Sequence, residues 1–178
     1  FLTRFAWFAI DRSIGEKNGV TIGQQSNIAP NAVLEKKMKL KNNYRTVRLI
    51  LGDQLNTNHS WFKIADDNVL FIIAELKQEA TYVKHHVQKL CAFFAAMKHF
   101  SQELIDNGHH VLYLTLDDTS EFDCLNKLIT VMLQRFNSQE FQYQQPDEYR
   151  LAKQIKEYNF PGDIQKTVVD SEHFLLPF

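Results

Sequence analysis

Short apolar runs alternate with amphipathic stretches from residue 46 onward, and this alternation limits the fold more than any other feature of the sequence. Continuous apolar and β-branched runs are typical of strands that are buried on both faces of a sheet. The stretches between them have the three- and four-residue spacing of helices. The alternation favours the α/β class, here a three-layer, Rossmann-like fold with a mostly parallel sheet flanked by helices. The predicted strands are 46–51, 69–73, 110–115, 140–143 and 165–169.

The longest predicted helix runs from about Thr81 or Tyr82 to Asn107, and Gly108 is expected to end it as the C′ residue. Its apolar stripe is expected in the core and consists of Leu90, Phe93, Phe94, Met97, Phe100 and Leu104. Two shorter helices are expected, near 121–136 and from 146–148 to about 158.

Polar side chains follow the first two predicted strands, at the point where each strand ends. Gly52, Asp53 and Gln54 come after the first strand, and Glu75 follows the second. In open α/β sheets, ligands bind beyond the carboxyl ends of the strands, where the strand order reverses. The sequence therefore predicts one ligand crevice at these strand ends. Its second wall is expected to come from an acidic, aromatic and histidine-rich cluster: Glu79, Tyr82, His85 and His86.

Several ligand classes are disfavoured by what the sequence lacks. It contains no Gly-x-Gly-x-x-Gly and no Walker loop, so a dinucleotide or nucleoside triphosphate site is not expected. The formal net charge of −1 gives no overall basic field for nucleic acid. No metal site is expected either, because the histidines at 85, 86, 109 and 110 lack a standard zinc-ligand spacing.

Length and composition indicate one domain of ordinary size in a reducing cytoplasm. The 178 residues are 44% hydrophobic, which is enough for a core. The two cysteines, Cys91 and Cys124, make neither a disulfide framework nor the four-cysteine set that an iron–sulfur cluster usually needs. No apolar run approaches the roughly 20 residues that span a bilayer, so no membrane partner is expected.

Residues 1–37 differ from the rest and are expected to be a leader or extension of uncertain order. The first methionine is Met38, so we expect the α/β domain to comprise residues 38–178. Residues 22–33 have the hexapeptide spacing of left-handed β-helix acyltransferases, but two hexads are fewer than the roughly three stacked repeats that a solenoid needs.

Three motifs, in order over residues 47–104, together resemble one family. They are Leu51-Gly-Asp-Gln-Leu55, then Glu75 with Glu79-Ala-Thr-Tyr-Val-Lys-His-His86 and Lys89, then Ala95-Ala-Met-Lys-His-Phe100 with Glu103-Leu104. This set resembles the deoxyribodipyrimidine photolyase-related proteins, the bacterial (6-4) photolyase and cryptochrome branch that carries an iron–sulfur cluster. A weaker similarity continues to about residue 176.

The resemblance implies that this segment is the N-terminal antenna domain of a flavoprotein for light-driven DNA repair. In that family, the domain binds 6,7-dimethyl-8-ribityllumazine, which passes light energy to reduced FAD in a following all-helical domain. The helical domain also carries the [4Fe-4S] cluster and binds damaged DNA. The implied partners are therefore the protein's own C-terminal helical domain and damaged DNA, and the segment alone is expected not to be catalytic.

A lumazine suits the predicted crevice, because its ring carbonyls, ring nitrogens and uncharged polyol need directional hydrogen bonds and apolar walls. Close backbone approach is expected at Gly52, and hydrogen-bond acceptance at Asp53 and Glu79. The other expected ligand-binding residues are Gln54, Glu75, Tyr82 and His85; adjacent histidines on a helix point about 100° apart, so only one of the pair is expected to face the pocket.

Structural roles for the same residues stay open. They are a strand-ending turn at Gly52-Asp53, a surface charge paired with Lys77 at Glu75, a helix-start acid at Glu79 and a core position for Tyr82. Two other functions also stay open. One is a stand-alone α/β small-molecule enzyme that uses Asp53 and Glu79 as an acid–base pair. The other is a chromophore-free interaction domain, for which a pocket filled by side chains would be the sign.

Overall fold

A computed structural model describes residues 40–78 and 86–172 of the chain. The chain divides into two units, Phe1–Leu34 and Glu35–Phe178, and all described residues belong to the second. The predicted leader at 1–37 lies outside the described residues, so its order stays a prediction. Among the described residues, no helix is both long and apolar enough to cross a membrane.

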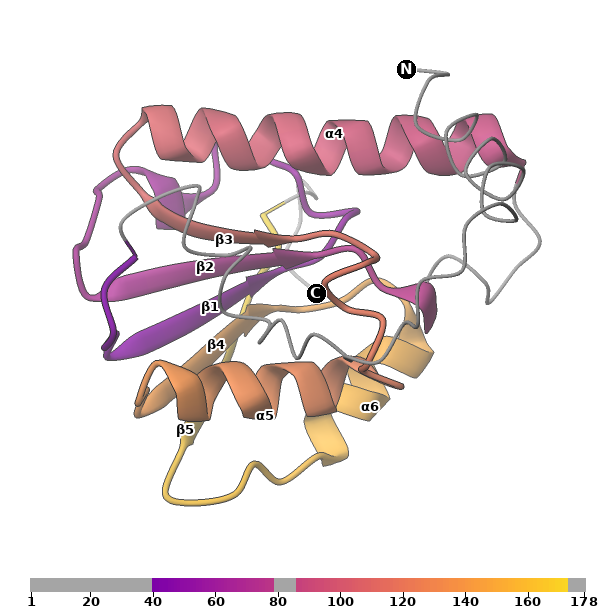
Figure 1. Ribbon diagram of the computed structural model, residues 1–178. Helices are drawn as coiled ribbons and strands as arrows, with labels where there is room; N and C mark the ends of the chain where they lie inside the picture. Colours follow the sequence, from indigo (N-terminus) through magenta and orange to yellow (C-terminus); the bar gives the residue numbers. More distant parts are fainter. Residues whose placement is uncertain (1–39, 79–85, 173–178) are drawn as a thin grey trace, which may run out of the picture. The chain divides into compact units, whose positions relative to one another are not determined.

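The described residues contain one parallel sheet of five strands in the order β3-β2-β1-β4-β5 (Figure 1). Every neighbouring pair in this sheet is parallel, which confirms and sharpens the predicted mostly parallel arrangement. In register, Thr46 of β1 lies opposite Val69 of β2 and Glu140 of β4. The strands are β1 (Thr46–Ile50), β2 (Val69–Ala74), β3 (His110–Leu114), β4 (Glu140–Gln144) and β5 (Gln165–Val169).

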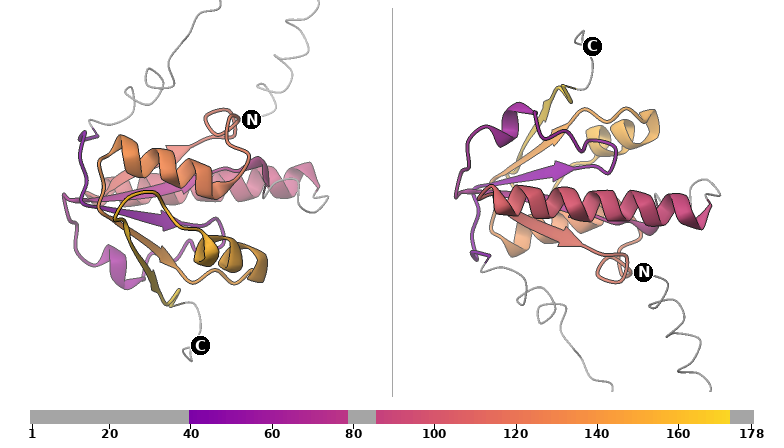
Figure 2. Two further views of the ribbon diagram at one scale, coloured as in Figure 1. Left: turned by 90° about the horizontal axis from the view of Figure 1, so that it is seen from below. Right: turned by 90° about the horizontal axis from the view of Figure 1, so that it is seen from above.

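Helices cover both faces of the sheet, which confirms the three-layer α/β class. The helices whose bounds lie within the described residues are the short 3-10 helix η1 (Ser60–Phe62), α4 (Val87–Asp106), α5 (Leu125–Arg135) and α6 (Tyr149–Glu157). The long α4 lies over one face, whereas α5 and α6 lie over the other (Figure 2). This split follows from the strand order, because the chain moves outward from β1 through β2 to β3 and then crosses back to β4.

An aromatic cluster fills the core between the sheet and α4. The ring centroid of Phe62 lies 5.3 Å from that of Phe71 on β2 and 5.7 Å from that of Phe100 on α4. Trp61 is buried in the same cluster, and the guanidinium of Arg48 lies 4.9 Å from its ring centroid. The opposite core combines aliphatic residues of α5, which buries Leu125, Leu128, Ile129, Met132 and Leu133, with the buried rings of Phe141 and Tyr143 on β4.

The helix boundaries differ from the predicted ones mainly at their first turns. In the described residues α4 starts at Val87, where the His86 ring caps it by accepting a hydrogen bond from the Gln88 amide at 3.3 Å; the earlier start predicted at 81 or 82 lies outside the described residues. Helix α5 starts at Leu125 rather than near 121, because hydrogen-bonded turns continue to Phe122, whose amide donates to the Thr119 carbonyl at 3.0 Å, and the backbone of Cys124 is extended. The predicted stop at Gly108 is confirmed, with φ +86°.

Candidate ligand-binding cleft

A cleft of about 130 Å³ opens at the carboxyl ends of β1 and β2. It lies at the switch point of the sheet, where the chain leaves β1 toward β2 on one side and β4 sits on the other. Apolar residues form most of its wall, and the acidic residues Asp53 and Glu148 are also part of it. The lining residues are Leu49, Ile50, Leu51, Gly52, Asp53, Ala74, Leu76, Phe93, Phe94, Met97, Leu125, Glu148 and Leu151.

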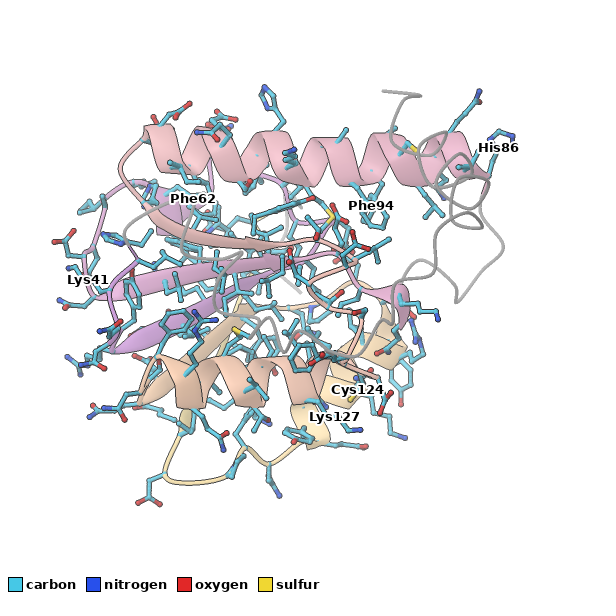
Figure 3. All side chains as sticks on the ribbon, in the orientation of Figure 1. Lys41, Phe62, His86, Phe94, Cys124 and Lys127 are labelled. Atoms are coloured by element: carbon cyan, nitrogen blue, oxygen red, sulfur yellow. The ribbon has the colours of Figure 1, made fainter. Side chains whose placement is uncertain are left out.

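Gly52 lines this cleft, and its missing side chain makes room for an aromatic ring of α4. A Cβ at Gly52 would overlap the tip of the Phe93 ring, lie 2.7 Å from its Cε1 atom and lie 3.0 Å from Met97 Sδ. The close approach expected at this glycine is therefore made by α4 itself in the described structure. Phe93 and Phe94 were expected in the core, but both are only partly buried and line the cleft. Figure 3 labels Phe94 on α4.

Gln54 lies behind the cleft wall and is not one of the described lining residues. Its side chain is buried, at 1% exposure, and both ends of its amide bind backbone. Oε1 accepts a hydrogen bond from the Leu51 amide at 3.2 Å, and Nε2 donates to the Gln144 and Gln145 carbonyls at 3.4 Å and 3.2 Å. Gln54 therefore ties the loop after β1 to the end of β4.

The Glu75 carboxylate also forms hydrogen bonds within the domain, to residues at the end of β3. One carboxylate oxygen accepts a hydrogen bond from the Tyr113 hydroxyl, and the other accepts from the Leu116 amide at 3.0 Å. The same Tyr113 hydroxyl lies 3.1 Å from the Phe94 carbonyl on α4. Glu75 is thus more than a solvent-facing surface charge: it joins the end of β2 to β3 and, through Tyr113, to the helix segment that lines the cleft.

The Tyr113 hydroxyl makes the free energy of unfolding of the domain depend on pH in the alkaline range. Burial, the hydrogen bond to Glu75 and the negative charge of Glu75 raise the pKa of Tyr113. Above about pH 10 the unfolded chain loses this proton while the folded domain keeps it, so the free energy of unfolding falls as pH rises. We expect Tyr113→Phe to remove up to about 1.4 kcal/mol per pH unit of that fall, as measured by urea unfolding between about pH 9 and pH 11.

The control for this measurement is Tyr149→Phe, because Tyr149 is 79% exposed. Burial also raises the pKa values of Tyr44 and Tyr143, so part of the slope remains in Tyr113→Phe. Equal slopes for Tyr113→Phe and the unsubstituted domain would contradict the assignment.

Three of the predicted site residues, Glu79, Tyr82 and His85, lie outside the described residues 40–78 and 86–172, so their roles stay predictions. Gly52 and Asp53 line the cleft, whereas Gln54 and Glu75 are bound to the loops that support it. Within the described ranges, no three His, Cys, Asp or Glu side chains cluster closely enough to hold a metal ion.

Glu148, Leu125 and Leu151 line the cleft although the sequence motifs do not include them. Leu125 and Leu151 carry no signal beyond ordinary core residues, because they reach the cleft only through the packing of α5 and α6. Glu148 could have been found, since it follows the end of β4, and the same strand-end rule that selected Asp53 applies there.

A second, larger hollow of about 520 Å³ lies beside the ends of β4 and β5. Its lining includes the exposed side chains of Tyr149 and Val168 together with Asp147 and Asp170. None of the motif residues Gly52, Asp53 or Glu75 contributes to it. Of these two hollows, only the smaller cleft is lined by the motif residues Gly52 and Asp53 and lies at the switch point of the sheet. It is therefore the candidate site.

The fold defines a class, the Rossmann-like three-layer α/β domains, and the cleft lies at the switch point of the parallel sheet, where open α/β sheets bind ligands. Sequence similarity identifies a family within this broad class. Residues 48–178 match the family model of deoxyribodipyrimidine photo-lyase-related proteins, and the chain belongs to this family. It is also 27% identical over 128 residues to a (6-4) photolyase of Agrobacterium fabrum (strain C58 / ATCC 33970), an alignment that covers 71% of this chain and 25% of the relative. The chain thus spans about a quarter of that relative's length, and the resemblance found in the sequence motifs is confirmed at the level of the family.

Proposed function

We propose that this chain is the N-terminal light-harvesting domain of a photolyase- or cryptochrome-like flavoprotein for light-driven DNA repair, and that its cleft binds 6,7-dimethyl-8-ribityllumazine. The observation that carries the proposal is the position of Gly52 and Asp53, motif residues of a photolyase-related chain, in an apolar cleft at the switch point. Repair activity, reduced FAD, the [4Fe-4S] cluster, contact with damaged DNA and a cytoplasmic location belong to the proposed full-length protein.

The donor and acceptor chemistry of the cleft fits a lumazine. Phe93, Phe94 and Leu151 supply apolar walls for a flat ring system, and Asp53 and Glu148 supply carboxylate acceptors for ring N–H and ribityl O–H groups. A bound lumazine would absorb violet-blue light, whereas the residues of this chain would only hold and orient it and keep water away. Gln54 and Glu75 contribute indirectly, because each ties a loop of the cleft to a neighbouring strand.

The cleft must widen before it can hold a lumazine. Ligand pockets for molecules of this kind usually measure about 300 Å³ or more, and the cleft measures about 130 Å³. Phe93 is the side chain best placed to move, since its ring is partly exposed and lies directly against Gly52. Rotation of that ring away from Gly52 would widen the cleft without disturbing Met97, which is buried.

Binding of the lumazine can be measured directly. We expect the full-length protein, stripped of chromophore and titrated with 6,7-dimethyl-8-ribityllumazine, to quench or shift the lumazine fluorescence with one saturable site. Free ribitol, which lacks the ring, is the control and should not compete at the same concentration. A protein that neither carries a lumazine from a lumazine-producing host nor binds added lumazine would contradict the proposal.

A chromophore-free interaction domain is the second candidate, and two observations favour it. The cleft is small, and an aromatic ring occupies the space beside Gly52 where a ligand would approach. The titration separates the two candidates, because a domain that has lost its chromophore would give no saturable signal. The enzyme alternative receives no support of this kind, since Glu79, the proposed partner of Asp53, lies outside the described residues.

A further inference from the structure

The segment that follows β5 is bound to the domain as far as Glu172. The Asp170 carbonyl accepts a hydrogen bond from the His59 ring at 3.0 Å, and the Glu172 amide donates to the Asp170 carboxylate at 3.0 Å. Ser171, between them, is 1% exposed although it belongs to no strand or helix. Chain segments beyond the last strand of a domain are usually poorly ordered unless they are tied down, so these contacts give the outgoing chain a defined course.

The Glu172 carboxylate makes the main attachment, to Ser60 at the start of η1. Its Oε1 accepts a hydrogen bond from the Ser60 hydroxyl at 2.5 Å, and its Oε2 accepts from the Ser60 amide at 3.0 Å. The Glu172 carbonyl accepts a third bond, from Asn56 Nδ2 at 3.5 Å. Hydrogen bonds to an ionised acceptor are stronger than those between neutral groups. The bond from the Ser60 hydroxyl also lowers the pKa of Glu172, which keeps the carboxylate charged at neutral pH.

The backbone of Glu172 has a conformation that is unfavourable without outside contacts. Its φ is +54°, in the left-handed region, which is disfavoured for a residue that carries a side chain. Such a conformation persists only where the surrounding structure imposes it. Here it is imposed by the hydrogen bonds to Asn56, Ser60 and Asp170. These bonds therefore set the direction of the chain at Glu172 as well as its position.

The attachment point on η1 belongs to the core of the domain. Trp61 is 8% exposed, and the ring centroid of Phe62 lies 5.3 Å from that of Phe71 on β2. The His59 ring is buried next to Trp61: its Nε2 donates to Asp170, and its Nδ1 accepts from the Trp61 amide at 3.1 Å. The outgoing chain is therefore fixed to the packed part of the domain rather than to a free surface loop.

We infer that Glu172 is a positioning residue, which fixes the direction in which the chain leaves the domain and thereby holds the cleft at a set distance and angle from the domain that follows in the proposed full-length protein. Ser60 and the cleft residues Gly52 and Asp53 belong to the same connection between β1 and β2, so one short segment carries both the anchor and a wall of the cleft. A chromophore that passes energy to another domain needs a fixed distance and orientation, which a freely flexible linker does not provide. The inference rests on the proposed function for the identity of the following domain, but the anchoring of the chain does not.

The positioning is tested on the full-length protein with lumazine and FAD bound, through the fluorescence lifetime of the lumazine. In Glu172→Ala, we expect the single short lifetime to be replaced by a spread of longer lifetimes, because the distance to the acceptor is no longer fixed. The affinity for 6,7-dimethyl-8-ribityllumazine should stay within about twofold, since Glu172 is not among the described residues that line the cleft. The same measurement on protein without FAD gives the lifetime in the absence of energy transfer.

A second readout needs no chromophore. Phe174 is the first aromatic residue after Glu172, and so it is the first preferred site at which chymotrypsin can cut the outgoing chain. Glu172→Ala should speed this cleavage at least about fivefold in the full-length protein, because proteolysis follows the population of the opened segment. Mass spectrometry of the fragments identifies the site of cleavage.

Three further variants assign the effects to the Glu172 carboxylate. Glu172→Gln keeps an acceptor for the Ser60 amide and a donor for the Ser60 hydroxyl, so it should resemble the unsubstituted protein in both readouts. Ser60→Ala removes only the hydroxyl and should give part of the Glu172→Ala effect. Glu157→Ala is the matched control, because it removes an exposed carboxylate at the end of α6 and should change neither readout. Thermal unfolding verifies that each variant retains the fold.

The outcomes separate this inference from the proposed function. If Glu172→Ala speeds cleavage but the full-length protein binds no lumazine, the proposed function fails and the anchoring of the outgoing chain stands. If lumazine binds but Glu172→Ala changes neither readout, the positioning role is wrong while the antenna function stands. Faster cleavage with an unchanged lifetime would also contradict the role, because the domains would then keep their arrangement without the anchor. If no lumazine binds and cleavage is unchanged, both are wrong.

Discussion

Replacement of Gln54 by glutamate is expected to destabilise the domain by about 3 kcal/mol or more at neutral pH. The two side chains have nearly the same shape, so the change tests hydrogen bonding rather than packing. The Gln54 amide donates to two carbonyls, those of Gln144 and Gln145, inside a site where Gln54 is 1% exposed. A carboxylate there would face both carbonyl oxygens with negative charge and would leave them without a donor.

Gln54→Met is the control, because it removes the hydrogen bonds without adding a charge and should cost about 1–3 kcal/mol. The extra cost of Gln54→Glu should disappear as pH falls. Burial beside carbonyl oxygens would raise the pKa of the introduced carboxyl, so the folded variant would hold a proton that the unfolded chain releases, and its stability would fall as pH rises. Urea unfolding of the variants at about pH 4.5 and pH 7 measures both effects.

A Gln54→Glu variant within about 0.5 kcal/mol of the unsubstituted domain would show that the Gln54 amide does not hold the loop to β4. In that case the amide would be free to turn toward a ligand, as the sequence motif alone suggested.

Replacement of Gly52 by alanine is the second change with a large expected effect, about 1–3 kcal/mol of destabilisation. The added methyl group would overlap the tip of the Phe93 ring and lie 3.0 Å from Met97 Sδ. Met97 is 2% exposed and has little room to move, so Phe93 or the loop must shift. Because both line the cleft, lumazine binding should weaken together with stability.

A double-mutant cycle with Phe93→Ala shows whether the ring is the cause. If Gly52 is required because Phe93 packs on it, the combined variant should be more stable than the sum of the single changes predicts, by about 0.5 kcal/mol or more. Additive effects would instead assign Gly52 to the strand-ending turn that also remained open from the sequence. Urea unfolding of the four proteins, followed by lumazine titration of each, gives both readouts.

Much of the fold could be predicted from the sequence because the signals for it are local. The strand at 165–169 was predicted at the observed bounds of β5, and Gly108 was recognised as a helix stop from its place in the chain. The helix starts were less accurate. Backbone hydrogen bonds close turns as far as Phe122, which apolar spacing does not reveal, and α5 therefore begins later than predicted.

The candidate site was predicted only in part, since a motif does not say which way its polar groups face. Gly52 and Asp53 line the cleft as expected. Gln54 and Glu75 instead form hydrogen bonds to residues far along the chain: Gln54 binds a carbonyl 90 residues away, and Glu75 binds an amide 41 residues away. The ring that fills the space beside Gly52 also comes from a distant helix, α4.

The amino-acid sequence by itself determined the α/β class, the order of the strands and helices along the chain, and membership of the photolyase-related family, because each depends on residue types and their spacing. Only the tertiary structure decided which motif residues support the cleft and which line it. Hydrogen bonds within the domain engage both ends of the Gln54 amide and both carboxylate oxygens of Glu75. Asp53 and Glu148 line the cleft, and Arg150 holds the Glu148 carboxylate through both of its oxygens.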